Sequence, residues 1–251
     1  MPGQSSIKTF IHSGDAGDTI YALPVLKYLA PEGGNLILGL KQRVRSVYTE
    51  KWASNIMPLL KIQPYIKDVW IQKPEDVWSY DMDPFRRLIF TKMRRGKNIS
   101  SYVCDAMGVP YNCYEAPWLM VDQPVHVEGK PVVVNRSGRY HNPSFPWGRV
   151  ASTYRNQMVF VGMEDEWHRF CADICVVPYC PTENALELAR MIAGCRLFIG
   201  NQSFAYSIAE GLKQNTLQET NQMIPDCMFV RHNAKFGMNA MVDFPELKNL
   251  Q

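Results

Sequence analysis

The feature that most constrains the fold is an alternation of short apolar runs with longer segments of helical spacing. In the first half of the chain, apolar runs at residues 7–12, 35–40 and 68–71 predict strands. Residues 19–29, between the first two runs, carry apolar side chains at helical intervals and predict a helix. Strands that alternate with helices are typical of a parallel sheet, so the first half is predicted to be α/β.

The same alternation begins again after residues 121–130, a segment of proline, glycine and charge that we interpret as a linker. Strands are then predicted at 132–135, 158–162, 174–177 and 196–200, and helices at 165–173, 182–193 and 203–212. Thr182 is the predicted N-cap of its helix, and Gly194 fits a C-terminal stop. The chain is therefore predicted to form two α/β domains, residues 1–124 and 125–251, which face a cleft where ligands bind at the carboxyl ends of the strands.

Composition excludes several classes of protein. The 251 residues carry 27 Lys and Arg against 24 Asp and Glu, a net charge of +3, and 46% are hydrophobic, which excludes histone-like, polyacidic and disordered chains. Seven cysteines, no N-terminal signal pattern and no run of ~20 apolar residues predict a cytoplasmic protein without a transmembrane segment. Cys171, Cys175 and Cys180 lie near His168 but lack the spacing of a zinc site, so we expect reduced thiols and no metal.

The first candidate site is the glycine-containing turn at residues 12–19, between the first predicted strand and helix. Its carboxylates, Asp15 and Asp18, would repel a phosphate but suit a base that removes a proton from an alcohol. The turn therefore favours an acceptor hydroxyl. The alternative is that Asp18 merely caps the helix, since Asp is a preferred N-cap residue.

The second candidate site follows the first strand of the second half, at residues 135–140. Its small residues expose backbone N–H groups, and its two arginines can form forked pairs with phosphate oxygens. This combination predicts a diphosphate site. The alternative is a surface turn with solvated arginines. The residues predicted to bind here are Asn135, Arg136, Ser137 and Arg139.

The third candidate site lies where a predicted strand, residues 196–200, leads into a helix. Gln202 and Ser203 fall at the helix N-terminus, where amide dipoles favour an anion. Glu210 lies about two helical turns beyond Ser203 and is predicted to hold ribose hydroxyls. The alternative for Glu210 is an ordinary exposed helix carboxylate.

Two of these segments resemble motifs of glycosyltransferase family 9, the heptosyltransferase family. Residues 17–29, GDTIYALPVLKYL, resemble the opening GD-hydrophobic-x-x-x-P-hydrophobic-L motif of that family. Residues 199–212, IGNQSFAYSIAEGL, are similar to its donor loop, G-N-D-S-G-x-x-H followed by a helix of small residues. The segment VFVG resembles the strand that precedes a glycine-rich turn in that family. Trp147 falls where the family has a tryptophan after the first strand of its donor domain. Matches in the same order span residues 11–216.

The resemblance implies a GT-B fold, with two Rossmann-like domains that bind the acceptor and a nucleotide-sugar donor. It implies inverting transfer without a metal or other cofactor, with Asp18 as the catalytic base. Gly200, Asn201 and Ser203 match the family's donor-phosphate loop. In place of the family's aspartate, glycine and histidine, this loop has Gln202, Phe204 and Ser207, which points to an unusual donor. Gln202 can still donate hydrogen bonds to a diphosphate.

The charge excess lies in the predicted acceptor domain, since residues 1–124 hold 15 basic and 12 acidic residues and residues 125–251 hold 12 of each. Residues 86–97 contain six cations and no acid: Arg86, Arg87, Lys92, Arg94, Arg95 and Lys97. Arg94 and Arg95, together with Asp15, are predicted to bind an anionic acceptor such as a phosphorylated glycolipid or nucleic acid. The alternative is a solvated basic helix.

Two other functions stay open beside a heptosyltransferase-like enzyme. The basic run and the aromatic residues that follow it, Tyr102, Tyr111, Tyr114 and Trp118, fit a DNA-modifying glycosyltransferase acting on a hydroxymethylated base. The altered donor loop fits a non-catalytic nucleotide-sugar binding module. A dinucleotide oxidoreductase is not favoured, because GxGxxG followed by a ribose-binding acid is missing from the sequence.

Overall fold

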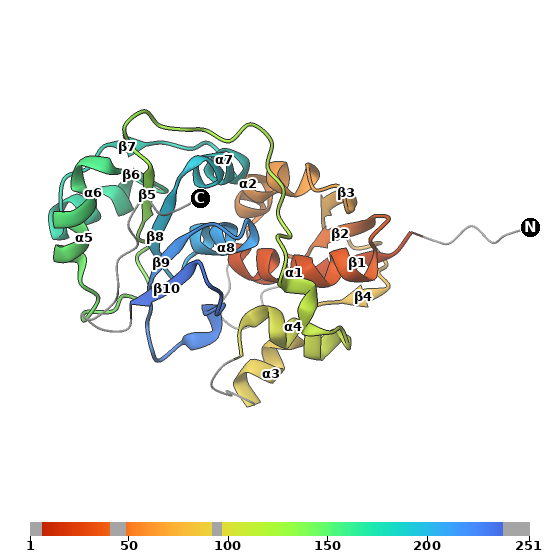
Figure 1. The fold of residues 1–251 in the computed structure, drawn as a ribbon. Coiled ribbons are helices and arrows are strands. Elements are labelled where there is room, and N and C mark those ends of the chain that lie inside the picture. Colours follow the sequence, from red (N-terminus) through yellow and green to blue (C-terminus); the bar gives the residue numbers. More distant parts are fainter. Residues whose placement is uncertain (1–6, 41–48, 92–96, 238–251) are drawn as a thin grey trace, which may run out of the picture. The chain divides into compact units, whose positions relative to one another are not determined.

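The computed structural model describes residues 7–40, 49–91 and 97–237, which belong to two compact units divided between Met120 and Val121. Each unit contains one sheet flanked by helices (Figure 1), and every strand pairing in the described residues is parallel. The predicted α/β character of both halves is confirmed. In the described part of the chain, no helix is long and apolar enough to span a bilayer.

The first unit has a four-stranded sheet of order β3-β2-β1-β4. Its elements are β1 (Thr9–His12), α1 (Ala16–Leu29), β2 (Gly34–Leu38), α2 (Glu50–Lys61), β3 (Ile66–Ile71), β4 (Tyr80–Asp81), α3 (Phe85–Thr91), α4 (Ile99–Met107) and the 3-10 helix η1 (Tyr111–Tyr114). The three strands predicted in this half each overlap β1, β2 or β3. Helices α2, α3 and α4 were not predicted.

Helix α1 is buried along most of its length, and Pro24 inside it explains part of the packing around it. Because proline has no N–H, the carbonyl of Ile20 lacks its usual helical donor. The indole Nε1 of Trp118 supplies one at 3.0 Å, and Ser100 Oγ donates to the neighbouring carbonyl of Tyr21 at 2.7 Å. These bonds attach α4 and the end of the unit to the helix that carries Asp18.

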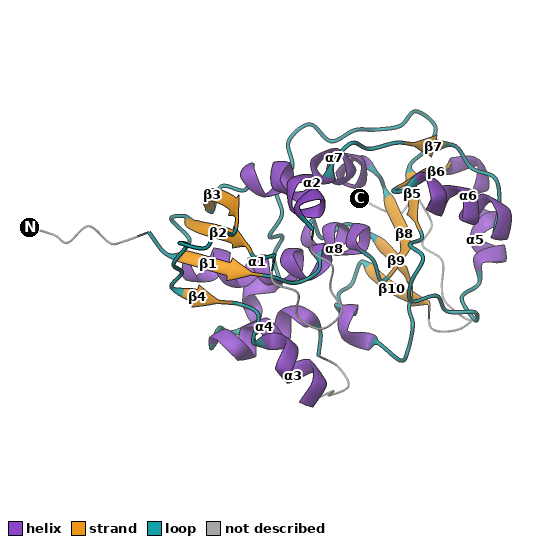
Figure 2. Ribbon diagram, turned by 180° about the vertical axis from the view of Figure 1, so that it is seen from behind, coloured by secondary structure: helices purple, strands orange, loops and turns teal. Residues whose placement is uncertain are grey.

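The second unit has a six-stranded sheet of order β10-β9-β8-β5-β6-β7. Its elements are β5 (Val132–Asn135), α5 (Trp147–Tyr154), η2 (Arg155–Gln157), β6 (Met158–Val161), α6 (Glu164–Asp173), β7 (Tyr179–Cys180), α7 (Ala185–Gly194), β8 (Leu197–Asn201), α8 (Phe204–Gly211), β9 (Thr216–Glu219), η3 (Pro225–Cys227) and β10 (Ala234–Gly237). Figures 1 and 2 show α5 and α6 on one face of this sheet and α7 and α8 on the other. The chain order places β5 and β8 side by side at the centre.

Strand β5 is apolar at consecutive positions because both faces of the sheet are covered. Val132 and Val134 belong to the core cluster that includes Trp147 and Phe170 of the helices on the first face. Val133, which points to the other face, is 1% exposed. This strand occupies the residues predicted for it.

The strand predicted at residues 174–177 is wrong. The chain joins the sheet later, at β7, where Pro178 O accepts from Phe160 N, and Val176 is 68% exposed. The N-cap predicted at Thr182 is also wrong. Asn184 occupies this position, and its side chain accepts from the backbone N–H groups of Leu186 and Glu187.

The helix stop predicted at Gly194 is confirmed, since α7 ends at this residue, and the glycine has a second role. It is the last residue of α7, and a Cβ atom there would lie 2.0 Å from the carbonyl oxygen of Val125. The segment around Val125 is fixed to α7, because Val125 N donates to Arg190 O at 2.9 Å and Gly194 O lies 2.6 Å from Nδ1 of His126. The glycine therefore allows part of the predicted linker to pack directly on the helix backbone.

We expect Gly194→Ala to lower the free energy of unfolding by about 1–3 kcal/mol, because the added methyl group collides with main-chain atoms. Urea unfolding of the full chain measures this. Gly148→Ala is the matched control, since no atom lies within 4 Å of its added Cβ and alanine favours the helix, so it should leave stability equal or slightly higher. Equal losses in the two variants would contradict the close-approach explanation.

Candidate functional site

In the first unit, the turn that joins β1 to α1 places Asp18 in the first turn of the helix. Asp15 is the N-cap, with extended backbone, and its carbonyl accepts from Thr19 N at 3.0 Å. The alternative that Asp18 caps the helix is therefore wrong. Its carboxylate instead accepts a hydrogen bond from Nη2 of Arg86 in α3.

The Asp18–Arg86 ion pair is partly exposed, with side chains that are 15% and 26% accessible. It forms beside Gly14, where an added Cβ would lie 3.0 Å from both Arg86 Nη2 and Asp18 Cβ, and 2.5 Å from His12 Nε2. A glycine at position 14 is what lets the guanidinium reach the carboxylate. The result is an ionised carboxylate held in one orientation yet open to solvent.

Asp83 anchors the start of α3 to the same turn. Its carboxylate accepts from Ser13 N at 2.8 Å and from Ser13 Oγ, and it is 4% exposed. Its carbonyl accepts from Arg86 N at 3.2 Å. Because this buried carboxylate ties α3 to the turn, it fixes the place from which Arg86 reaches Asp18.

His12, at the end of β1, is completely buried, and neither ring nitrogen has a hydrogen-bond partner among the described residues. Its Nδ1 lies 3.3 Å from Asp83 Oδ1. Burial lowers the pKa of His12 from 6.5 to about 4, and Arg86 acts in the same direction, although Asp83 opposes both. His12 is therefore neutral at pH 7 and adds no positive charge next to Asp18.

This pKa makes stability depend on pH. The unfolded chain takes up the His12 proton as the pH falls through 6.5, whereas the folded chain does so only near 4, so acid favours unfolding in that window. The free energy of unfolding therefore falls by about 2–3 kcal/mol between pH 6.5 and pH 4, and above pH 6.5 His12 causes no further change. We expect His12→Phe to flatten the pH dependence of urea unfolding between pH 6.5 and 4. An unchanged slope would contradict this origin.

The remaining acceptor residues are placed unevenly. Asp15 lies half-buried in the turn, next to the ion pair. Arg94 and Arg95 lie outside the described residues. Within the basic run, Arg86 is engaged by Asp18 and Lys97 by Asp105, so these two cations do not belong to a uniformly solvated basic helix.

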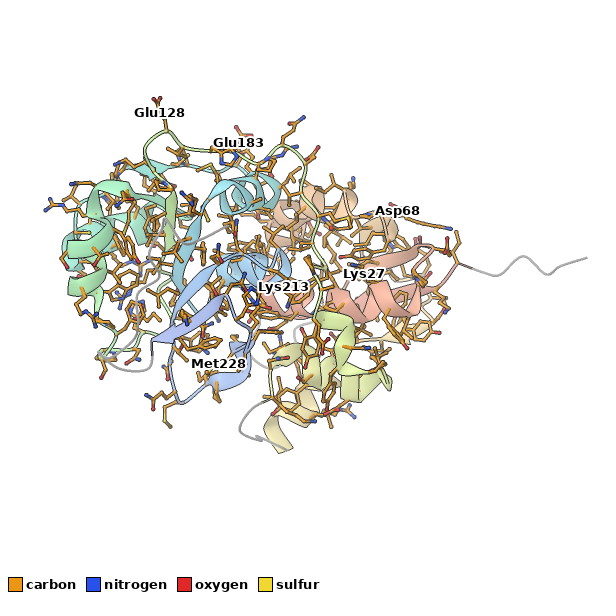
Figure 3. The ribbon with its side chains drawn as sticks, in the orientation of Figure 1. Lys27, Asp68, Glu128, Glu183, Lys213 and Met228 are labelled. Carbon is orange, nitrogen blue, oxygen red and sulfur yellow. The ribbon has the colours of Figure 1, made fainter. Side chains whose placement is uncertain are left out.

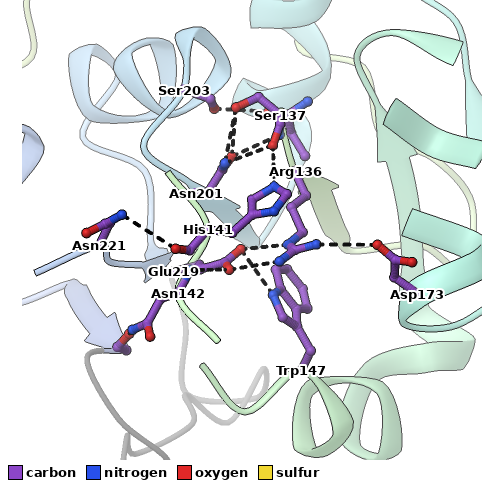
Figure 4. A network of polar contacts seen from close by, with 12 residues as sticks. Arg136, Ser137, His141, Asn142, Trp147, Asp173, Asn201, Ser203, Glu219 and Asn221 are labelled. Carbon is purple, nitrogen blue, oxygen red and sulfur yellow. Dashed lines mark hydrogen bonds and ion pairs between the residues drawn. The ribbon is translucent and has the colours of Figure 1, made fainter. Parts of the chain in front are cut away.

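In the second unit, the carboxyl ends of β5 and β8 bring the predicted donor residues together, as Figure 4 shows in part. The side chain of Asn201 accepts from Ser137 N at 2.9 Å and donates to the carbonyl oxygens of Ser137, at 3.1 Å, and Arg139. The Asn201 amide thus shapes the whole loop that follows β5. Arg139 itself is exposed and lies over the Tyr140 ring, 5.2 Å from its centre.

Ser203 is the N-cap of α8 and also connects it to β5. Its Oγ accepts from Tyr206 N at 3.3 Å and donates to Asn135 Oδ1 at 3.0 Å, while Asn135 Nδ2 donates to Val161 O at 3.0 Å. A Cβ on Gly200 would lie 2.6 Å from Asn135 O. These contacts hold three strand ends and the N-terminus of α8 at one edge of the sheet.

Arg136 does not present its guanidinium to a ligand at this edge. Its Nε and Nη2 donate to the two carboxylate oxygens of Glu219 at 2.8 and 3.1 Å, and the guanidinium lies 5.7 Å from the centre of the Trp147 ring. Glu219 is fully buried and also accepts from Asn142 N and from Trp147 Nε1. The forked pair of Arg136 is thus made inside the unit (Figure 4), and its diphosphate role stays a prediction.

Gln202 is also occupied internally. The side chain of Gln202 donates to the carbonyl of Ile224 and accepts from Asn221 N at 2.8 Å, and the residue is 2% exposed. It therefore ties the segment after β9 to the donor loop. In the structure the amide of Gln202 donates to the protein, and its contact with a diphosphate stays a prediction.

Glu210 is fully buried, so it is not the exposed helix carboxylate of the alternative interpretation. It pairs with Lys213 Nζ at 2.6 Å and Arg231 Nε at 2.9 Å, near the end of α8 where Lys213 is labelled in Figure 3. Two cations hold its carboxylate inside the unit. The contact of Glu210 with ribose stays a prediction.

The described residues contain no group of three or more His, Cys, Asp or Glu side chains arranged to hold a metal ion. The three cysteines considered for zinc, Cys171, Cys175 and Cys180, are half-buried and unoxidised in the structure.

Comparison with solved structures reveals the fold. No protein-family model matches the chain, and no curated protein matches it significantly in sequence. A glycosyltransferase family 9 protein from Veillonella parvula DSM 2008 is 12% identical, with a TM-score of 0.53 over 87% of this chain and 81% of that one. The E. coli heptosyltransferase WaaC, solved with ADP-2-deoxy-2-fluoro heptose, is 10% identical, with a TM-score of 0.54 over 91% of each chain.

The chain has the GT-B fold of the heptosyltransferases. E. coli ADP-heptose lps heptosyltransferase II agrees, with 10% identity and a TM-score of 0.51 over 93% of this chain and 92% of that one. The fold class predicted from the sequence is thus confirmed, as is the resemblance to family 9 at the level of the fold.

Within this GT-B fold, sequence reasoning missed three charged residues around the two sites. Arg86 and Glu219 come from segments far along the chain from their partners, and no local spacing pairs them. Glu166, at the start of α6, is the third. Burial raises its pKa, and its Oε2 lies 3.2 Å from the Cβ position of Gly162, just after β6. The motif VFVG followed by an acidic helix start was the available signal for it.

Proposed function

We propose that the protein is a glycosyltransferase that moves a sugar from a nucleotide-diphosphate donor to a hydroxyl of an acceptor, in the manner of a heptosyltransferase. The fold supports the class of reaction, since its solved neighbours include a heptosyltransferase with an ADP-sugar analogue. The observation that carries the proposal is the Asp18–Arg86 pair, which puts an oriented, solvent-accessible carboxylate at the start of α1. A general base for an alcohol needs this kind of positioning.

In the proposed mechanism Asp18 accepts the proton of the acceptor hydroxyl as the oxygen attacks the anomeric carbon. The bond from that carbon to the donor diphosphate breaks in the same displacement, so the configuration inverts. Arg86 keeps the carboxylate aimed and charged before the proton arrives. A misplacement of the base by 1 Å can cost about 10²-fold in rate, which explains why Asp83 and Gly14 build so rigid a support around this pair.

The departing diphosphate is proposed to bind at the carboxyl edge of the second sheet. Three features support this place: the N-terminus of α8 behind Ser203, the loop that Asn201 holds against β5, and the exposed Arg139. Helix amides and a guanidinium both favour a phosphate. Because the side chains of Arg136, Gln202 and Ser203 are bound internally, we assign the donor contacts to Arg139 and to the first backbone amides of α8.

The acceptor is proposed to be anionic, because the positive charge excess of the chain falls in residues 1–124. The structure weakens the DNA-modifying alternative, since two cations of the basic run, Arg86 and Lys97, are paired with Asp18 and Asp105. No metal takes part in the proposed transfer.

The experiment is a thermal-shift screen of the full chain against nucleoside diphosphates and nucleotide sugars, followed by a transfer assay with the donor that binds. A ligand at 100 times its Kd adds about 2.7 kcal/mol of stability, enough to detect. We expect a selective shift with one nucleotide, then transfer that persists in excess chelator. No shift with any member of a complete donor panel would contradict the proposal. Binding without transfer or hydrolysis would favour the non-catalytic module instead.

A further inference from the structure

Two cysteines of the first unit lie in contact, and the proposed reaction uses neither. Cys104 belongs to α4 and Cys113 to η1, and their Sγ atoms are 3.4 Å apart. Cys104 is buried, whereas Cys113 is partly accessible. A buried thiol is thus reached through a more exposed one.

The turn between the two elements produces this contact. Gly108 ends α4 in the left-handed region, with φ of 66°, a conformation that glycine adopts at no steric cost. Val109 N donates to Cys104 O at 3.0 Å, and Pro110 starts η1. The chain therefore reverses within a few residues and returns past the last turn of α4.

Side-chain contacts on both sides of the cysteines keep the two elements together. Ser101 Oγ and Tyr114 OH are 2.9 Å apart on one side. On the other, Tyr111 OH donates to Asp105 and accepts from Lys97 Nζ at 2.6 Å. Because both elements are fixed, the thiols stay opposite each other, and such proximity gives an intramolecular reaction a large advantage over attack by an outside thiol.

The two thiols are chemically unequal. The hydrogen bond from Cys104 lowers the pKa of Cys113, and the same contact together with burial raises the pKa of Cys104. A thiolate is the attacking species in disulfide exchange. Cys113 therefore has the access of an attacking thiol and the lower pKa of the two, and Cys104 is the thiol placed to resolve the product.

We propose that Cys104 and Cys113 form a dithiol modification site, which low-molecular-weight disulfides convert to an intramolecular disulfide. The Cys113 thiolate attacks one sulfur of the small disulfide, the bond between the two reagent sulfurs breaks, the other sulfur leaves as a thiolate that takes up a proton, and a mixed disulfide on Cys113 forms. Cys104 then loses its proton and attacks Cys113 Sγ, which releases the second small thiol. Two protein thiols are oxidised and one disulfide reagent is reduced to two thiols, so the electrons balance.

The bond would join α4 to η1 next to the helix that carries Asp18, since Ser100 of α4 is bonded to Tyr21 of α1. Three of the other cysteines are less suited to attack a disulfide. Burial raises the pKa of Cys195 to about 12, and it also raises the pKa of Cys175 and of Cys180. We therefore expect the reaction to be selective for the one pair.

The test treats the full chain with excess oxidised glutathione, quenches with acid, alkylates the free thiols under denaturing conditions and measures the intact mass. We expect two of the seven thiols to resist alkylation. Once the mass of the five alkyl groups is subtracted, the protein should be lighter than the reduced chain by two hydrogens. A peptide map should show a cross-linked peptide containing Cys104 and Cys113. Cys104→Ala should stop at a glutathione adduct on Cys113. Cys113→Ser should form neither product, and Cys175→Ser, the matched control, should cross-link like the wild type.

Three results would overturn the proposal. One is an adduct on Cys113 of the wild type that does not close, the second is alkylation of all seven thiols after treatment, and the third is an equal yield of disulfide in Cys113→Ser. Cys104→Ala could disturb the core, so circular dichroism must match the wild type for its adduct to count. If the spectrum of Cys104→Ala differs from that of the wild type, the Cys113→Ser variant and the peptide map of the wild type still test the proposal.

Discussion

Replacing Asp18 by Asn is expected to reduce sugar transfer by about 10²–10⁴-fold, because the amide cannot accept the proton of the acceptor hydroxyl. The side chain keeps its size, and Arg86 is 26% exposed, so water can solvate the guanidinium that loses its ionic partner. The fold should therefore survive. The measurement is kcat with the donor identified by thermal shift, together with the Kd of the corresponding nucleoside diphosphate.

The nucleotide Kd should be unchanged in Asp18→Asn, since the predicted donor residues lie in the second unit. Arg86→Met is a companion variant that keeps the carboxylate and removes what orients it. We expect it to lower kcat by about 10–100-fold, with partial recovery in Arg86→Lys. Wild-type turnover in Asp18→Asn would refute the assignment of the base, and wild-type turnover in Arg86→Met alone would refute only the positioning role.

Replacing Glu219 by Gln is expected to cost about 3–5 kcal/mol of the free energy of unfolding, because it leaves the charge of Arg136 buried without a counter-ion. Glu219 is fully buried and accepts four hydrogen bonds, from Arg136 Nε and Nη2, Asn142 N and Trp147 Nε1. A glutamine has one acceptor oxygen in place of two, and its NH₂ group would face a donor. Such a loss is a large part of the stability of an ordinary domain.

Urea unfolding followed by tryptophan fluorescence measures this loss, and Asp173→Asn is the matched control. Asp173 is the other carboxylate near Arg136, 3.9 Å from Nη1, but it is 61% exposed, so its removal should cost less than about 1 kcal/mol. Similar midpoints for wild type and Glu219→Gln would contradict the structural role of the pair. They would also reopen the possibility that Arg136 serves the donor diphosphate.

Much of the second unit could be predicted because its strands are buried on both faces. Residues 132–135 read as a continuous apolar run, and they form β5 without a shift. In the first unit, the missed helix α2 had a readable pattern, since Thr49 caps it and Ala53, Ile56, Leu59 and Leu60 face the core. The strand predicted at residues 174–177 was wrong because apolar character alone does not show whether a segment pairs with a neighbouring strand.

The sequence by itself determined the alternation of strands and helices, the turn that carries Asp18, and the two strand ends at Asn135 and Asn201. Local patterns suffice for these features, because each depends on residues close together in the chain. Only the tertiary structure decided which charges are used. Arg86 pairs with Asp18 across 68 positions and Arg136 with Glu219 across 83, and Glu210 pairs with Arg231 across 21. Ion pairs form where the fold brings opposite charges together. Charged residues of similar local appearance therefore end either beside a solvent-accessible carboxylate, as Arg86 does, or inside a unit, as Glu219 and Glu210 do.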